Sequence, residues 1–298
     1  MNAEKKYLKF WFPALISFLL SLIGFSLMHF ELTGYGYTFF IIIPITIGFF
    51  WGVKPDLRLS LIISVMVGLA AFFILLITSQ LEGLICVIIL LPFYMVLVVL
   101  GIWLGYVIRK KLFRNEKDTI KITLYPLLIL LFAGSIEHIL GNNYEEEYVE
   151  SKIELPYNAN RVYDYIKSVD TLEGKKSLLM KLGLAVPQKC ILENESVGAK
   201  RVCYFDGGSI EEEVTEIKPG ESLKMKVTNF KLPGLKWLKF EDANYTFNQN
   251  DSITILTRTT TYQSKLKPRF YWRFWEKQAI MAEHEYVLND LKRRLEEK

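Results

Sequence analysis

His284 is the residue in this sequence whose chemistry is easiest to define, because it interrupts an apolar pattern near the C-terminus. Phe274, Met281, Leu288 and Leu295 recur every seven residues in a predicted helix, and His284 follows Met281 by one turn. An imidazole among apolar side chains can orient a ligand through one hydrogen bond. The alternative is a structural histidine that bonds to a neighbouring strand or to water. The sequence leaves both interpretations open.

Three polar side chains on predicted strands are candidates for the same site. Tyr245, Arg258 and Tyr262 belong to runs in which alternate side chains share one face of a strand. The pattern does not say which face points inward. Catalysis would need an acid and a base that converge, and the sequence establishes no such pair. We therefore predict no catalytic residue and no cofactor, and treat the three residues as candidates for binding.

Two cysteines are predicted to lie opposite each other on a hairpin. Cys190 and Cys203 flank the turn "ENESVGAK" symmetrically, which predicts Cα atoms about 4.5–5.5 Å apart. A disulfide would be stable outside the cytoplasm. The alternative, which we favour, is a pair of free thiols on one face of the sheet. No histidine or further cysteine lies near them in the sequence, so we predict no metal site.

The first half of the chain is predicted to lie in a membrane. A helix needs about 20 apolar residues to cross the hydrocarbon core, and four uncharged runs meet this requirement. A fifth run is weaker, because Glu137 and His138 lie near its end. The five predicted spans are residues 10–30, 35–53, 59–80, 84–108 and 122–140.

Lysine and arginine predict the orientation of these spans, since short loops rich in them stay in the cytoplasm. The connections "ELTGYG" and "SQLEG" contain neither residue. Basic residues occur instead before the first run, between the second and third, and between the fourth and fifth: Lys5, Lys6, Lys9, Lys54, Arg58, Arg109, Lys110, Lys111, Arg114, Lys117 and Lys121. Five crossings then leave the N-terminus inside and the C-terminal half outside. If residues 122–140 are only interfacial, that half is cytoplasmic.

The C-terminal half shows the pattern of a soluble α+β domain. An alternating run, "YVESKIEL", precedes a helical pattern, and a second short helix is predicted at residues 172–182. Six further strand-like runs follow, separated by turn sequences such as "DGG" and "KPGE". A long helix closes the chain over residues 268–297.

This order resembles the START-like, or SRPBCC, superfamily, which includes the polyketide cyclase/dehydrase and lipid-transport group. The resemblance covers residues 148–298 and is carried by "IELPYNANRVYDYI", "DGGSIEEEVTEIKPGESLKMKV" and "TILTRTTTYQSKLKPRFYW" with the closing helix. It implies an antiparallel sheet wrapped around the last helix in a helix-grip fold. It also implies an apolar cavity for a lipid, sterol, polyketide or aromatic ligand. The predicted cavity residues are Phe274, Met281, His284, Leu288, Tyr245, Arg258 and Tyr262.

Two segments combine basic and aromatic residues, a mixture typical of membrane interfaces. They are "KLPGLKWLKF", with Leu235 and Trp237, and "KLKPRFYWRFW", with Tyr271 and Trp272. The alternative is a pair of solvated loops whose aromatic residues belong to the core.

The distribution of charge argues against nucleic acid as a partner. The chain has 36 basic and 32 acidic residues, but residues 141–298 carry 25 of each. A phosphate-binding domain would have its own basic excess. We predict a membrane protein whose START-like domain binds a lipid or another apolar molecule. A cyclase or dehydratase acting on such a molecule, and a sensor or assembly factor with a protein partner, are the alternatives.

Overall fold

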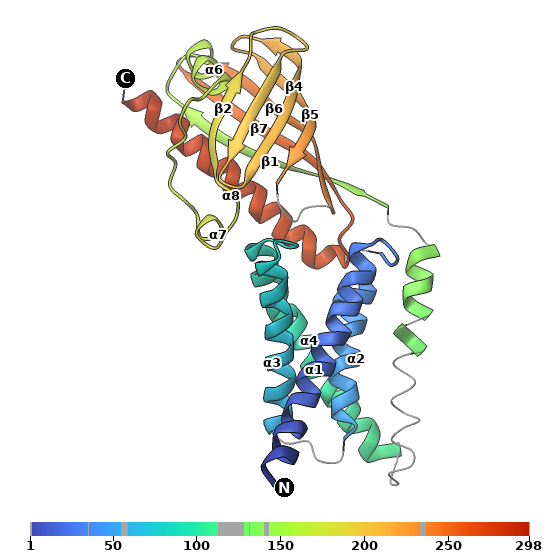
Figure 1. Cartoon of the computed structure of the whole chain (residues 1–298). Coiled ribbons are helices and arrows are strands. Elements are labelled where there is room, and N and C mark those ends of the chain that lie inside the picture. Colours follow the sequence, from blue (N-terminus) through green and yellow to red (C-terminus); the bar gives the residue numbers. More distant parts are fainter. Residues whose placement is uncertain are drawn as a thin grey trace. The chain divides into compact units, whose positions relative to one another are not determined.

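The computed structural model describes residues 2–34, 36–54, 59–112, 128–130, 132–139, 143–232 and 237–297. The chain divides into two compact units. One consists mainly of the N-terminal helices, and the other contains the sheet and most of the last helix (Figure 1).

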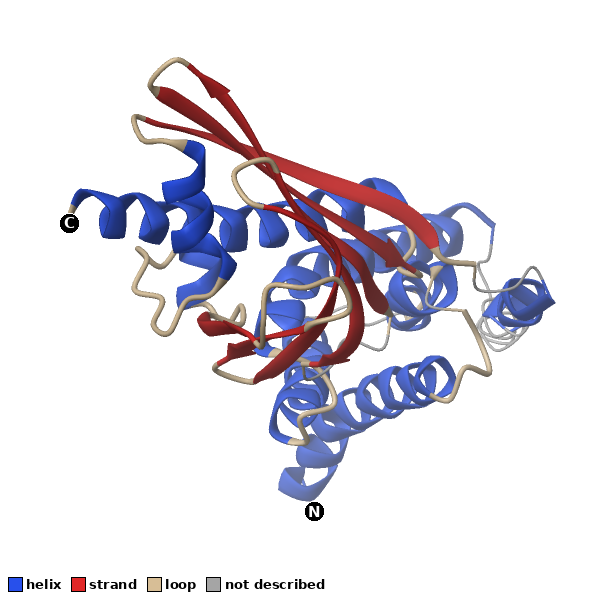
Figure 2. Ribbon diagram, turned by 90° about the horizontal axis from the view of Figure 1, so that it is seen from above, coloured by secondary structure: helices blue, strands red, loops and turns tan. Residues whose placement is uncertain are grey.

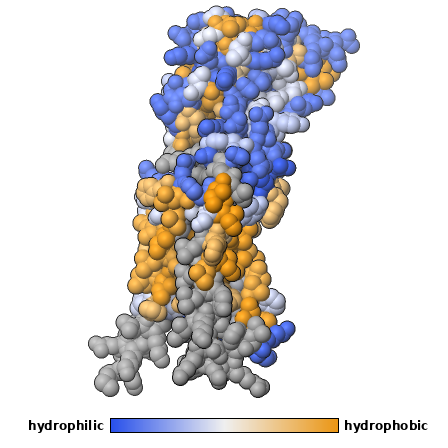
Figure 3. All heavy atoms as spheres, turned by 90° about the vertical axis from the view of Figure 1, so that its right-hand side faces the viewer, coloured by the Kyte–Doolittle hydropathy of each residue, from blue (hydrophilic) through white to orange (hydrophobic). Residues whose placement is uncertain are grey.

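The N-terminal unit is built from apolar helices. Its named elements are α1 (Asn2–His29), η1 (Thr38–Ile42), α2 (Ile43–Gly52), α3 (Leu59–Thr78) and α4 (Leu84–Leu112). Apolar side chains gather on the surface of this unit (Figure 3). A helix satisfies its own backbone hydrogen bonds, which is what a chain inside hydrocarbon requires.

Three helices in the described part of the chain are long and apolar enough to cross a membrane: Phe10–His29, Leu59–Thr78 and Leu84–Lys111. They correspond to the predicted spans 10–30, 59–80 and 84–108. The predicted span 35–53 appears as a shorter apolar helical segment, Thr38–Gly52. The span 122–140 lies partly outside the described residues. Five crossings therefore remain a prediction.

Glycines set the packing of α2 against α4. Gly48 lies against the backbone of Val98, and Gly101 lies against the backbone of Ile45. A Cβ atom at either glycine would collide with main-chain atoms, which cannot move aside as a flexible side chain can. Small residues at such crossings let membrane helices approach closely. These glycines therefore allow α2 and α4 to pack closely.

The C-terminal unit is an antiparallel sheet with a long helix (Figure 2). Its elements are β1 (Glu145–Leu155), α6 (Ala159–Lys167), α7 (Leu178–Lys181), β2 (Pro187–Leu192), β3 (Lys200–Phe205), β4 (Gly208–Lys218), β5 (Ser222–Lys231), β6 (Leu238–Asn250), β7 (Ile253–Ser264) and α8 (Arg269–Glu296). The strands form one sheet in the order β1-β7-β6-β5-β4-β3-β2. The predicted order of one strand, two helices, six strands and a long helix is confirmed.

Local signals explain where the short helices begin. The Asn158 side chain accepts a hydrogen bond from the Asn160 backbone N–H at 2.9 Å and caps α6. Ser177 caps α7 in the same way. The predicted helix at residues 172–182 is therefore shorter than expected, because the capped turn begins only after Ser177. The first strand begins at Glu145, slightly before the predicted boundary at Tyr148.

The apolar core lies between the sheet, α6 and the second half of α8. It includes Val162 and Ile166 from α6, Leu223 from β5, Leu256 from β7 and Leu291 from α8. The inward face of the sheet beside the part of α8 that precedes Tyr286 is instead rich in polar groups. That difference along one helix separates the structural core from the candidate site.

Candidate ligand-binding site

The three strand residues predicted for the site all lie on the buried face of the sheet. Tyr245, Arg258 and Tyr262 are buried. Arg258 on β7 lies opposite Tyr245 on β6 and opposite Ser151 on β1. Alternate residues of a strand share a face, so Tyr262 follows Arg258 on the same side. The register thus answers the question of orientation that the sequence left open.

His284 lies on the inward face of α8, but both of its ring nitrogens already have partners on the sheet. Nε2 is 2.8 Å from the Thr260 hydroxyl, and Nδ1 is 3.0 Å from the Ser151 hydroxyl. The side chain is fully buried. This geometry favours the structural role for His284 over the ligand-orienting role.

Burial and the nearby positive charge of Arg258 lower the pKa of His284 to about 2. In the unfolded chain, the pKa of histidine is about 6.5. The folded state therefore keeps a neutral imidazole over a pH range in which the unfolded state takes up a proton. The contribution of His284 to stability is fully present above about pH 6.5 and is lost progressively as the pH falls.

We expect a His284→Gln variant to show a weaker loss of stability in acid than the wild type. The difference in slope should approach about 1.4 kcal/mol per pH unit between about pH 6 and pH 4. Thermal unfolding of the full chain in detergent at several pH values measures it. The carboxylates are the same in both proteins and affect both equally. Parallel curves of stability against pH would therefore contradict the conclusion that His284 is buried as a neutral imidazole.

The predicted seven-residue stripe does not describe the buried face of α8. Phe274 is 56% exposed and Met281 is 37% exposed, whereas Leu288 is buried. The placement of Phe274 and Met281 toward the sheet is wrong. On a straight helix, residues seven positions apart are rotated by about 20° relative to each other. A strict seven-residue repeat therefore moves gradually away from the face that packs against the sheet. The buried residues of α8 include Trp272, Glu276, Ile280, His284, Val287, Leu288, Leu291 and Leu295.

Arg258 forms a buried ion pair with a residue of α8 that the sequence analysis missed. Its Nη2 donates to Glu283 Oε1 at 3.0 Å and lies 2.8 Å from Oε2. The guanidinium carbon lies 5.4 Å from the centre of the Tyr245 ring, within the range of a cation–π contact. Glu283 directly precedes His284 in the sequence. A carboxylate at the edge of the inward face of α8 could therefore have indicated a partner for a buried arginine.

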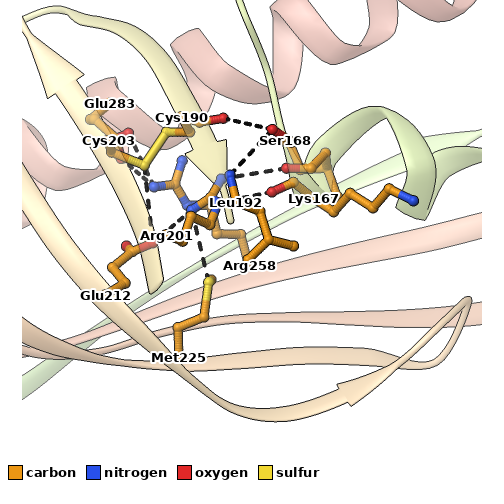
Figure 4. The surroundings of a disulfide bond; sticks show 11 residues. Lys167, Ser168, Cys190, Leu192, Arg201, Cys203, Glu212, Met225, Arg258 and Glu283 are labelled. Carbon is orange, nitrogen blue, oxygen red and sulfur yellow. Dashed lines mark hydrogen bonds and ion pairs between the residues drawn. A yellow bond between two sulfur atoms is a disulfide. The ribbon is translucent and has the colours of Figure 1, made fainter. Parts of the chain in front are cut away.

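A second buried ion pair, Arg201 with Glu212, has a structural role. The residues face each other on β3 and β4, and Nη1 donates to Glu212 Oε2 at 2.7 Å. Arg201 Nε donates to the Lys167 carbonyl at 3.0 Å, and Nη2 donates to the Ile166 carbonyl at 3.4 Å. These carbonyls end α6, where a cation is favourable. Figure 4 shows this arrangement beside the cysteines.

Cys190 and Cys203 face each other on β2 and β3, as predicted. Their Cα atoms are 4.0 Å apart, slightly closer than expected, and their sulfur atoms form a disulfide. The preference for free thiols is therefore corrected. Spacing around the turn predicted the pairing, but spacing alone cannot show whether the two sulfur atoms are bonded.

The predicted interface residues are only partly at the surface. Trp237 and Trp272 are buried, and Tyr271 is half-buried. Leu235 lies outside the described residues. The structure favours the alternative in which Trp237 and Trp272 belong to the interior. A basic flank alone could not distinguish these cases, because core aromatic residues also occur beside lysine and arginine.

Comparisons with known proteins find similarity at the level of structure. The sequence matches no protein-family model and no curated protein. A START superfamily protein from Mycobacterium smegmatis aligns with 52% of this chain and 99% of its own, at 10% identity and a TM-score of 0.37. The protein Ms6760 from Mycobacterium smegmatis aligns with 51% of this chain and 96% of its own, at 12% identity and a TM-score of 0.34.

A Polyketide_cyc-like protein, Cgl2372 from Corynebacterium glutamicum, aligns with 51% of this chain and 93% of its own. Its identity is 20% and its TM-score is 0.28. The order of elements and strands and the closing helix give the C-terminal half an α+β fold, in which one antiparallel sheet packs with a long C-terminal helix.

Proposed function

We propose that the C-terminal half binds an apolar small molecule, a lipid or an isoprenoid, between the sheet and α8. The observation that carries this proposal is the change of character along the inward face of α8. From Tyr286 onward α8 packs into an apolar core, whereas Glu276 and His284, earlier in the helix, bond to polar side chains on the sheet. Ligand sites of this kind combine apolar walls with a few placed polar groups.

Binding explains these polar groups better than catalysis does. Glu212 and Glu283 are each paired with an arginine. His284 is neutral and bonded through both ring nitrogens. General acid–base catalysis requires a group that can exchange a proton near physiological pH. The cyclase or dehydratase alternative is therefore less well supported by these residues.

Mass spectrometry of co-purifying molecules tests the proposal. The full chain is purified in mild detergent with a protease site inserted after Asn143, directly before β1. After cleavage, the fragment that begins at Tyr144 is isolated and extracted. We expect one apolar species in about equimolar amount with the fragment, and not the mixture that coats the N-terminal helices. A folded fragment free of apolar molecules would reject the proposal.

We also propose that the C-terminal half lies outside the cytoplasm and is tethered by the N-terminal helices. Two independent observations support this placement. The basic residues cluster in alternate loops, as expected for five crossings. Cys190 and Cys203 form a disulfide, and disulfides are stable in oxidising compartments outside the cytoplasm.

A topology reporter tests this placement. We expect a periplasmic or lumenal reporter fused after Lys298 to be active, because six basic residues between Arg109 and Lys121 hold that loop in the cytoplasm. A second fusion after Lys111 serves as the matched control and should be inactive. Activity only from the Lys111 fusion would reverse the model, and inactivity of both would leave four crossings.

A further inference from the structure

Arg258 has hydrogen-bond donors that the described residues do not use. The residue is only 8% exposed. Its Nη2 is engaged by Glu283, whereas Nε and Nη1 have no hydrogen-bond partner among the residues that the structure describes. Buried donors without partners are costly, more so on a charged group. The free nitrogens lie on the inward face of the sheet, where the proposed ligand would bind.

The shape of a guanidinium restricts what the free nitrogens can hold. A carboxylate binds in a fork, either between Nη1 and Nη2 or between Nε and Nη2. Both forks include Nη2, which has two N–H groups and already donates to Glu283 Oε1 at 3.0 Å, with Oε2 at 2.8 Å. A ligand carboxylate in either fork would place a second anion on the nitrogen that Glu283 contacts. Nε and Nη1 point to different sides and cannot form a fork with each other. Each of them is therefore suited to a single acceptor oxygen.

The charges around Arg258 also favour an uncharged ligand group over an anion. Two buried arginines, Arg201 and Arg258, stand beside two buried or half-buried carboxylates, Glu212 and Glu283. His284 is neutral and adds no charge. The charges of these two pairs balance, so an anionic ligand beside Arg258 would add a negative charge that neither pair compensates, which is unfavourable in a buried site. An uncharged oxygen leaves both pairs balanced.

We propose that Arg258 recognises one uncharged oxygen, a hydroxyl or a carbonyl, at the polar end of the apolar ligand. This inference rests on the proposed binding function and narrows its ligand class to neutral molecules such as long-chain alcohols, prenols or ketones. Fatty acids and lipid phosphates fall outside that class. The guanidinium carbon of Arg258 lies 5.4 Å from the centre of the Tyr245 ring. This cation–π contact helps to fix the orientation of the N–H donors.

Arg201 offers a matched control within the same domain. It is also buried and pairs with a carboxylate at 2.7 Å, and its guanidinium carbon lies 5.9 Å from the centre of the Tyr245 ring. Its three nitrogens donate to Glu212, to the Lys167 carbonyl and to the Ile166 carbonyl. It therefore has no nitrogen left for a ligand. Replacing both Arg201 and Glu212 therefore removes a buried ion pair but no unpaired N–H donor.

The experiment compares three probes of equal chain length. Tritiated hexadecanol, hexadecane and palmitate are exchanged into phosphatidylcholine nanodiscs that contain the full chain, and protein-dependent retention is measured against empty nanodiscs. A pH of about 9 keeps palmitate ionised. We expect the wild type to bind hexadecanol about ten- to hundredfold more tightly than hexadecane or palmitate, which corresponds to one hydrogen bond to a charged donor.

Two charge-neutral variants separate recognition from folding. Arg258→Met with Glu283→Leu removes the free donors and both charges of that pair, and should reduce the preference for hexadecanol over hexadecane to about one. Hexadecane binding should stay unchanged. Arg201→Met with Glu212→Leu should keep the preference. Circular dichroism of both variants shows whether the sheet is intact.

The outcomes distinguish this inference from the proposed function. Absence of binding for all three probes in the wild type rejects the proposed function itself. Equal binding of hexadecanol and hexadecane keeps that function but overturns the role of Arg258, as it would if water satisfied the free nitrogens. Preference for palmitate overturns the uncharged class. A preference that persists without Arg258 assigns the recognition elsewhere and also overturns the inference.

Discussion

Replacing Arg201 with methionine is expected to lower the free energy of unfolding of the C-terminal half by about 3–5 kcal/mol. The substitution leaves Glu212 as a buried charge without its partner, which lies 2.7 Å away in the wild type. It also leaves the Ile166 and Lys167 carbonyls at the end of α6 without their donor. The sheet and α6 should therefore separate at a lower denaturant concentration.

The double variant Arg201→Met with Glu212→Leu provides the control. Replacing both members of a buried pair with apolar groups of similar size is often neutral, so most of the loss should disappear. A deficit of about 1–2 kcal/mol should remain for the two carbonyls. Pulse proteolysis of the full chain across a urea series measures both variants. Equal losses in the single and double variants would show that the ion pair does not carry the effect.

Replacing Gly101 with leucine is expected to disrupt the packing of α2 against α4 and to abolish stable accumulation of the chain. Even a Cβ atom at this position would collide with the backbone oxygen of Ile45, and the Phe49 backbone nitrogen lies 2.9 Å from it. Main-chain atoms of a helix cannot yield without breaking its hydrogen bonds. Close approach between membrane helices depends on such small residues.

Val99→Leu on the same helix is the matched control, because Val99 is exposed in the structure and one added methylene there meets no neighbour that must shift. Size-exclusion chromatography of both variants in the same detergent measures the monodisperse fraction. Wild-type behaviour is expected for Val99→Leu and loss of the monodisperse peak for Gly101→Leu. A monodisperse Gly101→Leu protein with wild-type thermal stability would refute the crossing.

The order of elements could be predicted from the sequence because each element carries its own local signal. Alternation identifies the strands, turn residues separate them, and Asn158 begins a helix whose apolar positions have helical spacing. The opposition of Cys190 and Cys203 was predictable for the same reason, since a short hairpin fixes its own register. These are properties of neighbouring residues.

The inward face of α8 could not be predicted in the same way. The pattern through Phe274, Met281 and Leu288 is regular, yet only Leu288 of these three is buried. Packing against a twisted sheet selects a stripe with steps of three and four residues, and polar members such as Glu276 and His284 hide it from a search for apolar repeats. Which residues of α8 face inward therefore depends on the shape of the sheet against which the helix packs.

The buried charges were missed because their partners are distant in the sequence. Arg258 and Glu283 belong to a strand and a helix, and Arg201 reaches both β4 and the end of α6. Charged residues are ordinarily assigned to the surface. Only the three-dimensional arrangement shows that two nitrogens of Arg258 have no partner among the described residues, whereas each nitrogen of Arg201 has one.

Photo-crosslinking tests most directly the claim that an apolar molecule binds between the sheet and α8. The full chain in phosphatidylcholine nanodiscs is irradiated with a diazirine analogue of hexadecanol, with and without excess unlabelled hexadecanol, and then digested. We expect competable labels on the inward residues of β6, β7 and α8, including peptides with Tyr245, Tyr262 and Ile280. Labels confined to the N-terminal helices, with none on the sheet or α8, would contradict it.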